Sequence, residues 1–184
     1  MTSVTTNTNQ SHRVQWYVMR AYKNEKRAEE ILSGDHGLPF FIPKRYILQT
    51  VHGKQIRRLV PTIPGMIFVR ASRVEINEFK SRCPFIQYVV WKKRTGSEYL
   101  VVPEKEMDSF IKVTTQEEAP ITYYPLEEIN FKKGTPVRIT GGTFDGVEGT
   151  FVKVKGKRNR RLVVNLPHIL AASVEVEPQW VEAL

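Results

Sequence analysis

The chain has 184 residues, of which 41% are hydrophobic, so it is long enough for one large or two small domains and apolar enough to bury a core. That composition excludes wholesale disorder. The formal net charge of +9 at pH 7 favours contact with a polyanion such as nucleic acid, because Lys and Arg side chains that neutralise phosphates release counterions.

Cysteine and histidine usage argues against disulfide and metal chemistry. Cys83 is the single cysteine, so no intrachain disulfide and no cysteine-rich metal site can form, and we expect it to be a small buried residue. The four histidines lie far apart and show no ligand spacing. We also find no nucleophile with a partner base and no paired carboxylates. We therefore expect no enzyme, no catalytic residue, no cofactor and no metal.

The amino-terminal residues show no targeting signal. Residues 1–12 are polar and lack the apolar stretch of a signal peptide, so we expect a disordered tail. No uninterrupted apolar run approaches the ~18 residues that span a bilayer. With a single cysteine, these features predict a cytoplasmic monomer without a membrane partner.

The charge distribution predicts two domains. Residues 13–114 carry 19 basic and 10 acidic groups, and residues 129–184 carry nine basic and five acidic groups. Between them, residues 115–128 contain four acids, no base and two prolines. This composition predicts an acidic linker, although a long surface loop within one domain is the alternative.

The first predicted domain opens with a strand, a helix and a hairpin. Residues 14–19 are apolar or aromatic and predict a strand. Asn24 can cap a helix that ends near Gly34. Residues 45–60 predict two strands around His52-Gly53, and residues 66–70 predict another strand. The helix places three apolar residues on one face: Ala28, Ile31 and Leu32.

The rest of this domain alternates helix and strand. Ser72 and Glu75 form an S-x-x-E capping box that opens a second helix. Residues 86–91 predict a strand, and Pro103 opens a third helix with acidic residues in its first turn. Strands and helices interleaved with hairpins indicate an α+β fold, an antiparallel sheet flanked by helices. The inward side chains of the two helices are expected to be Ile76, Phe79, Met107, Phe110 and Ile111.

The last predicted domain, residues 129–184, is all-β. Short apolar stretches separated by turn residues predict four or five strands, which fit a small SH3-like β-barrel. Its clearest pattern is the glycine-rich run at residues 141–149, where glycines can supply positive φ and Phe144 can fold back over the core. An ordinary glycine-rich turn is the alternative. A phosphate-binding loop fits less well, because the order G-x-x-x-x-G-K-[ST] is absent.

Three motifs in order resemble the NusG family. Residues 137–155, with glycines at 142, 146 and 149, resemble the KOW motif. Trp16-Tyr17-Val18 and Pro64-Gly65-Met66-Ile67-Phe68-Val69 resemble the two best-marked stretches of the NusG amino-terminal domain. The resemblance covers residues 14–184 and implies an amino-terminal NusG domain at residues 13–114, followed by a KOW barrel.

Two departures make the chain more similar to a specialised paralogue. The F-P-G-Y slot of the family reads Ile63-Pro64-Gly65-Met66, and residues 165–173 lack the S-I-F-G-R sequence of the housekeeping factor. The chain looks similar to the operon-specific antiterminators RfaH and UpxY. The UpxY branch implies a role in long capsular-polysaccharide operons.

The resemblance implies a binding mechanism. The amino-terminal domain would lay an apolar cavity over the clamp helices of RNA polymerase, so that clamp opening is disfavoured and pausing and termination are suppressed. Because strand faces alternate, each residue assigned to this cavity can instead be an ordinary core side chain. Matching the family motif assigns the cavity to Tyr17, Ile63, Met66, Phe68, Tyr88 and Trp91.

Basic residues predict a nucleic-acid contact. Residues 36–74 contain seven bases and no acid, and five of the bases lie at residues 44–58, in the predicted hairpin and directly before it. Such a ribbon can contact phosphates of upstream or non-template DNA without reading sequence, or it can be a solvated edge that protects a sheet from aggregation. A second basic cluster begins the first helix, a region that approaches the non-template strand in the antiterminator branch. The candidates are Arg20, Lys23, Lys26, Arg27, Lys44, Arg45, Lys54, Arg57 and Arg58.

The barrel carries its own basic loop, which can bind RNA, a ribosomal protein or nothing. In the family, the barrel recruits ribosomal protein S10 or the termination factor Rho. Many Val, Ile and Thr residues favour strand, so we expect an ordinary barrel and not the helical alternative of RfaH-like relatives. The candidate partner-binding residues are Phe144, Lys157, Arg158, Arg160, Ile169 and Leu170.

Two other interpretations stay open at this point. A housekeeping NusG-type factor would couple polymerase to the ribosome or to Rho. A ribosome-associated RNA-binding protein could also carry a KOW barrel, and co-sedimentation with polymerase or with ribosomal subunits separates the two.

Overall fold

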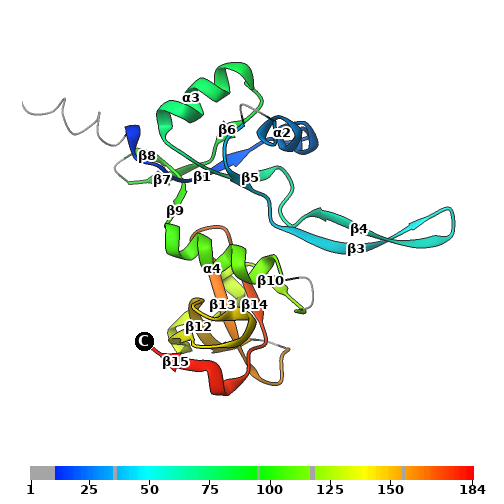
Figure 1. Ribbon diagram of the computed structural model, residues 1–184, viewed down its shortest axis with the longest axis vertical. Helices are drawn as coiled ribbons and strands as arrows, with labels where there is room; N and C mark the ends of the chain where they lie inside the picture. Colours follow the sequence, from blue (N-terminus) through cyan, green and yellow to red (C-terminus); the bar gives the residue numbers. More distant parts are fainter. Residues whose placement is uncertain (1–10, 35–36, 95, 117–118, 155) are drawn as a thin grey trace, which may run out of the picture. The chain divides into compact units, whose positions relative to one another are not determined.

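A computed structural model describes residues 11–34, 37–94, 96–116, 119–154 and 156–184 (Figure 1). The chain forms two compact units, Met1–Val102 and Pro103–Leu184. The predicted tail at residues 1–12 lies outside the described residues except for its last two positions.

The first unit is built on an antiparallel sheet. Its strand order is β2-β5-β1-β6, and β9 also pairs with β1. The longest pairing joins β1 to β5 and runs from Gln15 opposite Ala71 to Arg20 opposite Met66. The strands are β1 (Gln15–Arg20), β2 (Phe40–Phe41), β5 (Met66–Ala71), β6 (Gln87–Tyr88) and β9 (Val101–Val102).

Two helices, α2 (Glu25–Leu32) and α3 (Arg73–Arg82), pack on one face of this sheet. The predicted α+β class, an antiparallel sheet flanked by helices, is confirmed. Successive side chains of a strand point to opposite faces, so Trp16, Val18 and Phe68 lie on the face away from these helices. The core under the helices contains Tyr17, Met19, Ile67, Val69, Ala28, Leu32, Ile76 and Phe79.

Local capping signals decide where the two helices begin. The Glu75 amide donates to Ser72 Oγ over 3.3 Å and the Ser72 amide donates to Glu75 Oε2 over 2.7 Å, so the predicted capping box is confirmed. Hydrogen bonds from the Ser72 side chain and from the Ser72 amide to its carboxylate lower the pKa of Glu75. Asn24 occupies the N-cap of α2, but its side chain makes no capping bond and donates to the Tyr22 carbonyl oxygen.

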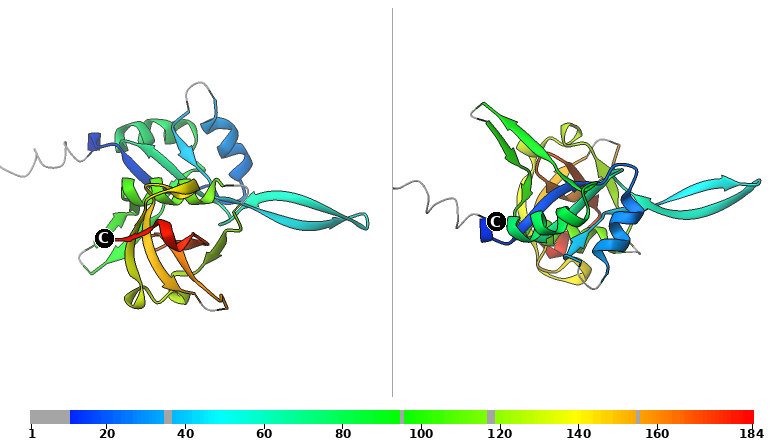
Figure 2. Two further views of the ribbon diagram at one scale, coloured as in Figure 1. Left: turned by 60° about the horizontal axis from the view of Figure 1, so that its bottom comes forward. Right: turned by 90° about the horizontal axis from the view of Figure 1, so that it is seen from above.

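The predicted hairpin forms a long two-stranded ribbon, β3 (Lys44–Val51) and β4 (Lys54–Pro61). Its turn residues His52 and Gly53 have φ values of 49° and 75°, as a two-residue type I′ turn requires. The ribbon projects from the sheet of the first unit, as Figures 1 and 2 show. We call it the basic ribbon.

The predicted strand at residues 86–91 is in fact two strands in different sheets. β6 pairs with β1 at Met19, whereas β7 (Val90–Lys93) pairs with β8 (Gly96–Tyr99) in a second ribbon. The chain changes partner at Val89, whose amide donates to Val18 while its carbonyl accepts from Leu100. We call the β7–β8 pair the aromatic ribbon.

The second unit contains a six-stranded antiparallel sheet with the order β10-β14-β13-β12-β11-β15. Short 3-10 turns connect or end several strands: η1 (Leu126–Glu128), η2 (Phe131–Lys133), η3 (Gly142–Phe144) and η4 (Pro178–Trp180). The strands are β10 (Thr122–Tyr124), β11 (Thr135–Ile139), β12 (Glu148–Lys153), β13 (Arg160–Leu166), β14 (Leu170–Val174) and β15 (Val181–Ala183).

Helix α4 (Glu104–Thr114) lies within the second compact unit, although the sequence predicts it as the last element of the first domain. It packs on β12, β13 and β14. The Phe110 ring lies 6.5 Å from the Tyr123 ring, and Ser109 Oγ accepts from the Glu148 amide over 3.3 Å. Periodicity places apolar residues on one face of a helix, but it does not say which sheet that face meets.

The described part of the predicted acidic linker, residues 115–128, includes a strand. β10 pairs with β14, and the buried Tyr124 joins the same hydrophobic cluster as Ile129 and Val163. The Pro120 carbonyl accepts from Arg161 Nη2 over 3.1 Å. An acidic, proline-containing composition therefore concealed a short edge strand, which the available edge of β14 stabilises.

The glycine-rich run behaves as predicted. Gly142 and Gly146 have φ values of 70° and 79° around the turn η3, and Phe144 is buried. At Gly149 a Cβ atom would lie 2.6 Å from the Val163 carbonyl oxygen, so β12 and β13 can approach only with glycine there.

Candidate functional site

The six residues assigned to a polymerase cavity do not form one exposed patch. Tyr17 is buried between the sheet and its helices, and its hydroxyl accepts from Gln15 Nε2 over 2.8 Å. Met66 and Phe68 face the other side of the sheet and are buried as well. All three side chains are thus buried in this structure, because strand alternation turns Tyr17 toward the helices and Met66 and Phe68 toward the opposite face of the sheet.

Tyr88 supports a stack of side chains. Its half-buried ring lies 4.1 Å from the Tyr99 ring in a stacked arrangement and 5.6 Å from the Tyr17 ring edge to face. Its hydroxyl donates to Asn77 Oδ1 over 3.2 Å. Burial raises the pKa of Tyr88.

The aromatic ribbon carries the accessible apolar surface of this region. Trp91 is 40% exposed, Val90 48% and Tyr99 39%. Val90 and Tyr99 are paired across the ribbon and share a face, whereas Trp91 shares the other face with Glu98. Ile63 is half-buried, in the turn that leads into β5. Of the six predicted residues, Trp91 is therefore the most accessible.

The basic ribbon is exposed along most of its length. Its bases alternate with large apolar side chains, because Tyr46, Leu48 and Arg57 share one face and Ile47, Ile56 and Arg58 share the other. The Arg57 guanidinium lies 3.7 Å from the centre of the Tyr46 ring. Each face thus presents both charge and stacking surface to a partner.

The predicted bases of the basic ribbon divide into two groups. Lys44 stands at its base and forms an ion pair with Glu29 of α2, so it anchors the ribbon to the helix. Arg45, Lys54, Arg57 and Arg58 are exposed further out. Arg58 donates to Gln49 Oε1 over 3.2 Å within the ribbon.

The second predicted basic cluster surrounds the start of α2. Arg20, Lys23, Lys26 and Arg27 are all exposed. The Arg27 guanidinium lies 5.1 Å from the Phe85 ring centre and Lys26 pairs with Glu30 over 3.8 Å.

The candidate partner residues of the second unit are dispersed. Phe144 and Leu170 are buried in this structure. Ile169 is half-buried in the turn between β13 and β14, where its amide donates to the Leu166 carbonyl. Lys157, Arg158 and Arg160 gather at the opposite end of β13, near the loop from β12, so the candidate residues lie on two separate surfaces.

Sequence reasoning did not find the hydrogen-bonded centre of this unit. Arg161 is 5% exposed and donates to Ser173 Oγ over 3.0 Å, to Glu175 Oε2 over 3.3 Å and to the Pro120 carbonyl. A basic run in a sequence looks uniformly solvated. Strand alternation places Arg161 on the face of β13 opposite to Arg160 and Leu162, and this was the signal that could have separated it from the exposed bases.

Two further observations bear on chemistry. Among the described residues, no group of three His, Cys, Asp or Glu side chains could hold a metal ion. None of the described helices is long and apolar enough to cross a membrane.

Comparison with known proteins identifies the family. A sequence model of the family described as transcription termination factor nusG matches residues 14–111. A solved structure titled "Domain interaction in Thermotoga maritima NusG" aligns with a TM-score of 0.44 and 18% identity, over 95% of this chain and 99% of that chain. A search of curated proteins finds no match. Because the family model covers more than half of the sequence, the chain belongs to the NusG family of transcription elongation and termination factors.

Proposed function

We propose that this protein is a specialised elongation and antitermination factor, which binds the RNA polymerase clamp through its first unit and suppresses pausing and termination on a long operon such as one for a capsular polysaccharide. The proposal that the protein binds RNA polymerase rests on the family match over residues 14–111. These residues include the sheet of the first unit, helices α2 and α3 and both ribbons. Binding that favours the closed clamp shifts the enzyme toward elongation without covalent chemistry.

The aromatic ribbon is the surface of the first unit that best fits such a contact. Trp91 is exposed on one face of this ribbon and Val90 and Tyr99 on the other, and large aromatic side chains contribute strongly to protein interfaces. The Tyr88 ring stacks on the Tyr99 ring and so restricts its position. We include Ile63, which is half-buried, in the same proposed contact.

Capture of purified RNA polymerase by the immobilised full chain tests this surface. We expect Trp91→Ala to weaken binding by about tenfold or more, the usual cost of removing an interface hot spot. Val74→Ala is the matched control, because Val74 is 44% exposed on α3 and lies outside the proposed contact. Equal capture of a folded Trp91→Ala variant would remove the aromatic ribbon from the interface.

The specialised role is supported by the two departures from the housekeeping pattern, at residues 63–66 and 165–173. Run-off transcription across a terminator tests it, with the leader of the protein's own operon and with an unrelated leader. Read-through only with its own leader supports the specialised role. Equal read-through on both templates indicates the general factor instead.

The two ends of β13 suggest separate partners. We assign a protein partner, ribosomal protein S10 or Rho, to the turn around Ile169. Capture of purified S10 or Rho by the wild-type chain but not by Ile169→Asp tests this assignment. We assign the basic ribbon to phosphates of upstream or non-template DNA, because four exposed bases without an acidic neighbour in sequence suit a polyanion.

A further inference from the structure

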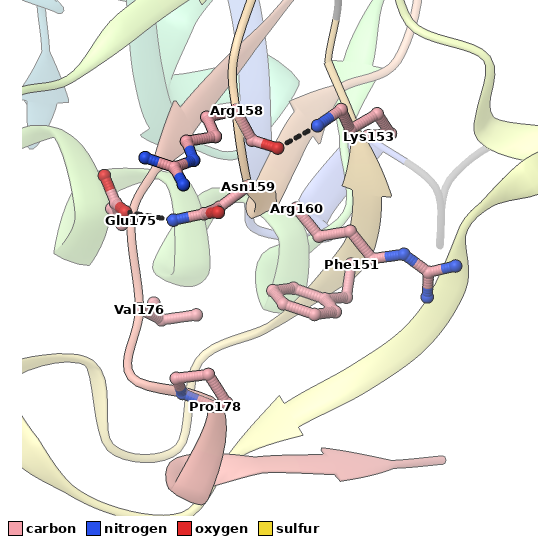
Figure 3. Close-up of a pocket in the computed structure, with 8 residues that line it drawn as sticks. All are labelled: Phe151, Lys153, Arg158, Asn159, Arg160, Glu175, Val176 and Pro178. Carbon is pink, nitrogen blue, oxygen red and sulfur yellow. Dashed lines mark hydrogen bonds between the residues drawn. The ribbon is translucent and has the colours of Figure 1, made fainter.

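The basic end of the β12–β13 hairpin is hollowed. A pocket of about 530 Å³ opens there, within the size range of small-molecule and nucleotide sites. In Figure 3 the Phe151 ring lies between a basic edge with Lys153 and Arg158 and an apolar edge with Val176 and Pro178. The eight lining residues are Phe151, Lys153, Arg158, Asn159, Arg160, Glu175, Val176 and Pro178.

Strand register explains why an aromatic ring and two bases meet. Phe151 pairs with Leu162 and Lys153 pairs with Arg160, so these four side chains share one face of the hairpin. Leu162 is completely buried, whereas Phe151 is half-buried and the two bases are exposed. The face therefore changes from core to open surface at Phe151, and that ring forms the floor of the hollow.

The charge of the pocket is strongly positive. Its single acid, Glu175, accepts from Arg161 over 3.3 Å and from Asn159 over 3.3 Å, so its charge is already compensated. Among the residues that the structure describes, no carboxylate forms an ion pair with Arg158 or Arg160. The Lys153 ammonium contacts only a neutral acceptor here, the Arg158 carbonyl (Figure 3). Three positive charges are left to attract an anion.

A second hollow adjoins the first and extends its positively charged lining. It has a volume of about 260 Å³, shares Arg158, Asn159 and Glu175 with the first, and adds Lys157 and Thr122 to the lining. Positive charge thus extends over two adjoining hollows along the loop. A ligand with repeated negative charges matches this arrangement better than a single small anion does.

We propose that these hollows bind an unpaired nucleic-acid strand, with a base stacked on Phe151 and the flanking phosphates at Lys153, Arg158 and Arg160. A basic groove with an aromatic floor is the arrangement that binds single strands without strong sequence preference. A duplex cannot place a base on this ring, because its bases are paired and the ring is recessed. An acidic peptide would satisfy the bases but has no flat ring for Phe151. RNA and single-stranded DNA share the required chemistry.

Fluorescence anisotropy of the full chain with labelled oligo-uridine RNA and oligo-thymidine DNA tests the site. The measurements use a chain with Arg45, Arg57 and Arg58 each changed to Gln, so that the basic ribbon does not contribute. We expect Phe151→Leu to weaken binding about tenfold, as loss of one base–aromatic stack does, and Phe151→Tyr to restore it. The ratio of the two affinities shows whether RNA or DNA is the preferred strand.

A charge variant provides an independent readout. Arg158→Gln with Arg160→Gln should lower the slope of log K against log salt by about 1.4, since each phosphate contact to a single strand contributes about 0.7. Lys132→Gln with Lys133→Gln removes the same charge from exposed positions in the same unit and should leave the slope unchanged. Circular dichroism confirms the fold of each variant.

Three results would overturn the proposal. The first is unchanged binding by folded Phe151→Leu. The second is a duplex of the same length that binds as tightly as the single strand. The third is equal competition by an oligo-glutamate peptide, which would indicate an acidic protein as the partner of this surface. None of these results depends on polymerase binding, so the Trp91 experiment is judged separately.

Discussion

The chain contains two basic hairpins that look alike in sequence and differ in how they are supported. The β3–β4 ribbon is exposed on both faces, with Tyr46, Leu48 and Ile56 all accessible. The β12–β13 hairpin buries Val152, Val163 and Leu162 and opens only at its basic end. The first hairpin is held by its turn and its cross-strand pairs, whereas the pocket of the second lies where one face of the hairpin passes from the core to the surface.

The largest expected contrast comes from one substitution made in both hairpins. Leu162→Ala should destabilise the second unit by about 2–5 kcal/mol, because a buried leucine leaves a cavity. Leu48→Ala, at 69% exposure on the basic ribbon, should change stability by no more than about 0.5 kcal/mol. Urea unfolding followed by hydrogen exchange of the β13 and β3 amides measures both effects. Comparable losses would show that the ribbon is packed against something in solution.

A smaller contrast separates the inward and outward arginines. Arg161→Met should cost about 1–3 kcal/mol, because the Pro120 carbonyl and the Ser173 hydroxyl lose a buried donor. Arg58→Met on the ribbon should cost little, since its one bond to Gln49 is exposed. The same unfolding measurement applies. If Arg161→Met is as stable as the wild-type chain, the strand β10 is not held to the sheet by this side chain.

The smallest contrast concerns what each hairpin binds. Arg57→Gln with Arg58→Gln should lower the salt slope for duplex DNA by about 1.8, at about 0.9 for each phosphate contact. Arg158→Gln with Arg160→Gln should leave the duplex slope unchanged and act on single strands. Anisotropy titrations at several salt concentrations check both variants against the Lys132/Lys133 double variant. If Arg57→Gln with Arg58→Gln leaves the salt slope for duplex DNA unchanged, the basic ribbon is a solvated edge and not a DNA contact.

The features predicted correctly from the sequence depend on neighbours in the chain. The Ser72–Glu75 capping box, the His52-Gly53 turn and the positive φ at Gly142 and Gly146 each follow from two to four adjacent residues. The buried state of Cys83 was also predicted correctly. Such signals survive because local geometry admits few conformations for these residues.

Several differences between prediction and structure concern whether a side chain faces a core or a binding surface. Tyr17 and Phe68 were candidates for an interface because they lie in a recognisable motif, yet both are closed in the structure. The Tyr88 ring is half-buried and stacks on the Tyr99 ring. Apolar alternation marks both faces of β1 and β5 as suitable for burial, and the sequence pattern cannot rank a core against a binding surface.

By itself the sequence determined the family, the α+β class with a β-rich second half, the excess of positive charge and the turns that reverse the chain. Only the tertiary structure decided that α4 and β10 belong with the second sheet, that Arg161 points inward while Arg158 and Arg160 stay outside, and that Phe151 forms the floor of a pocket. The physical reason is that turns and caps are set by neighbouring residues, whereas burial depends on contacts between segments far apart in the chain.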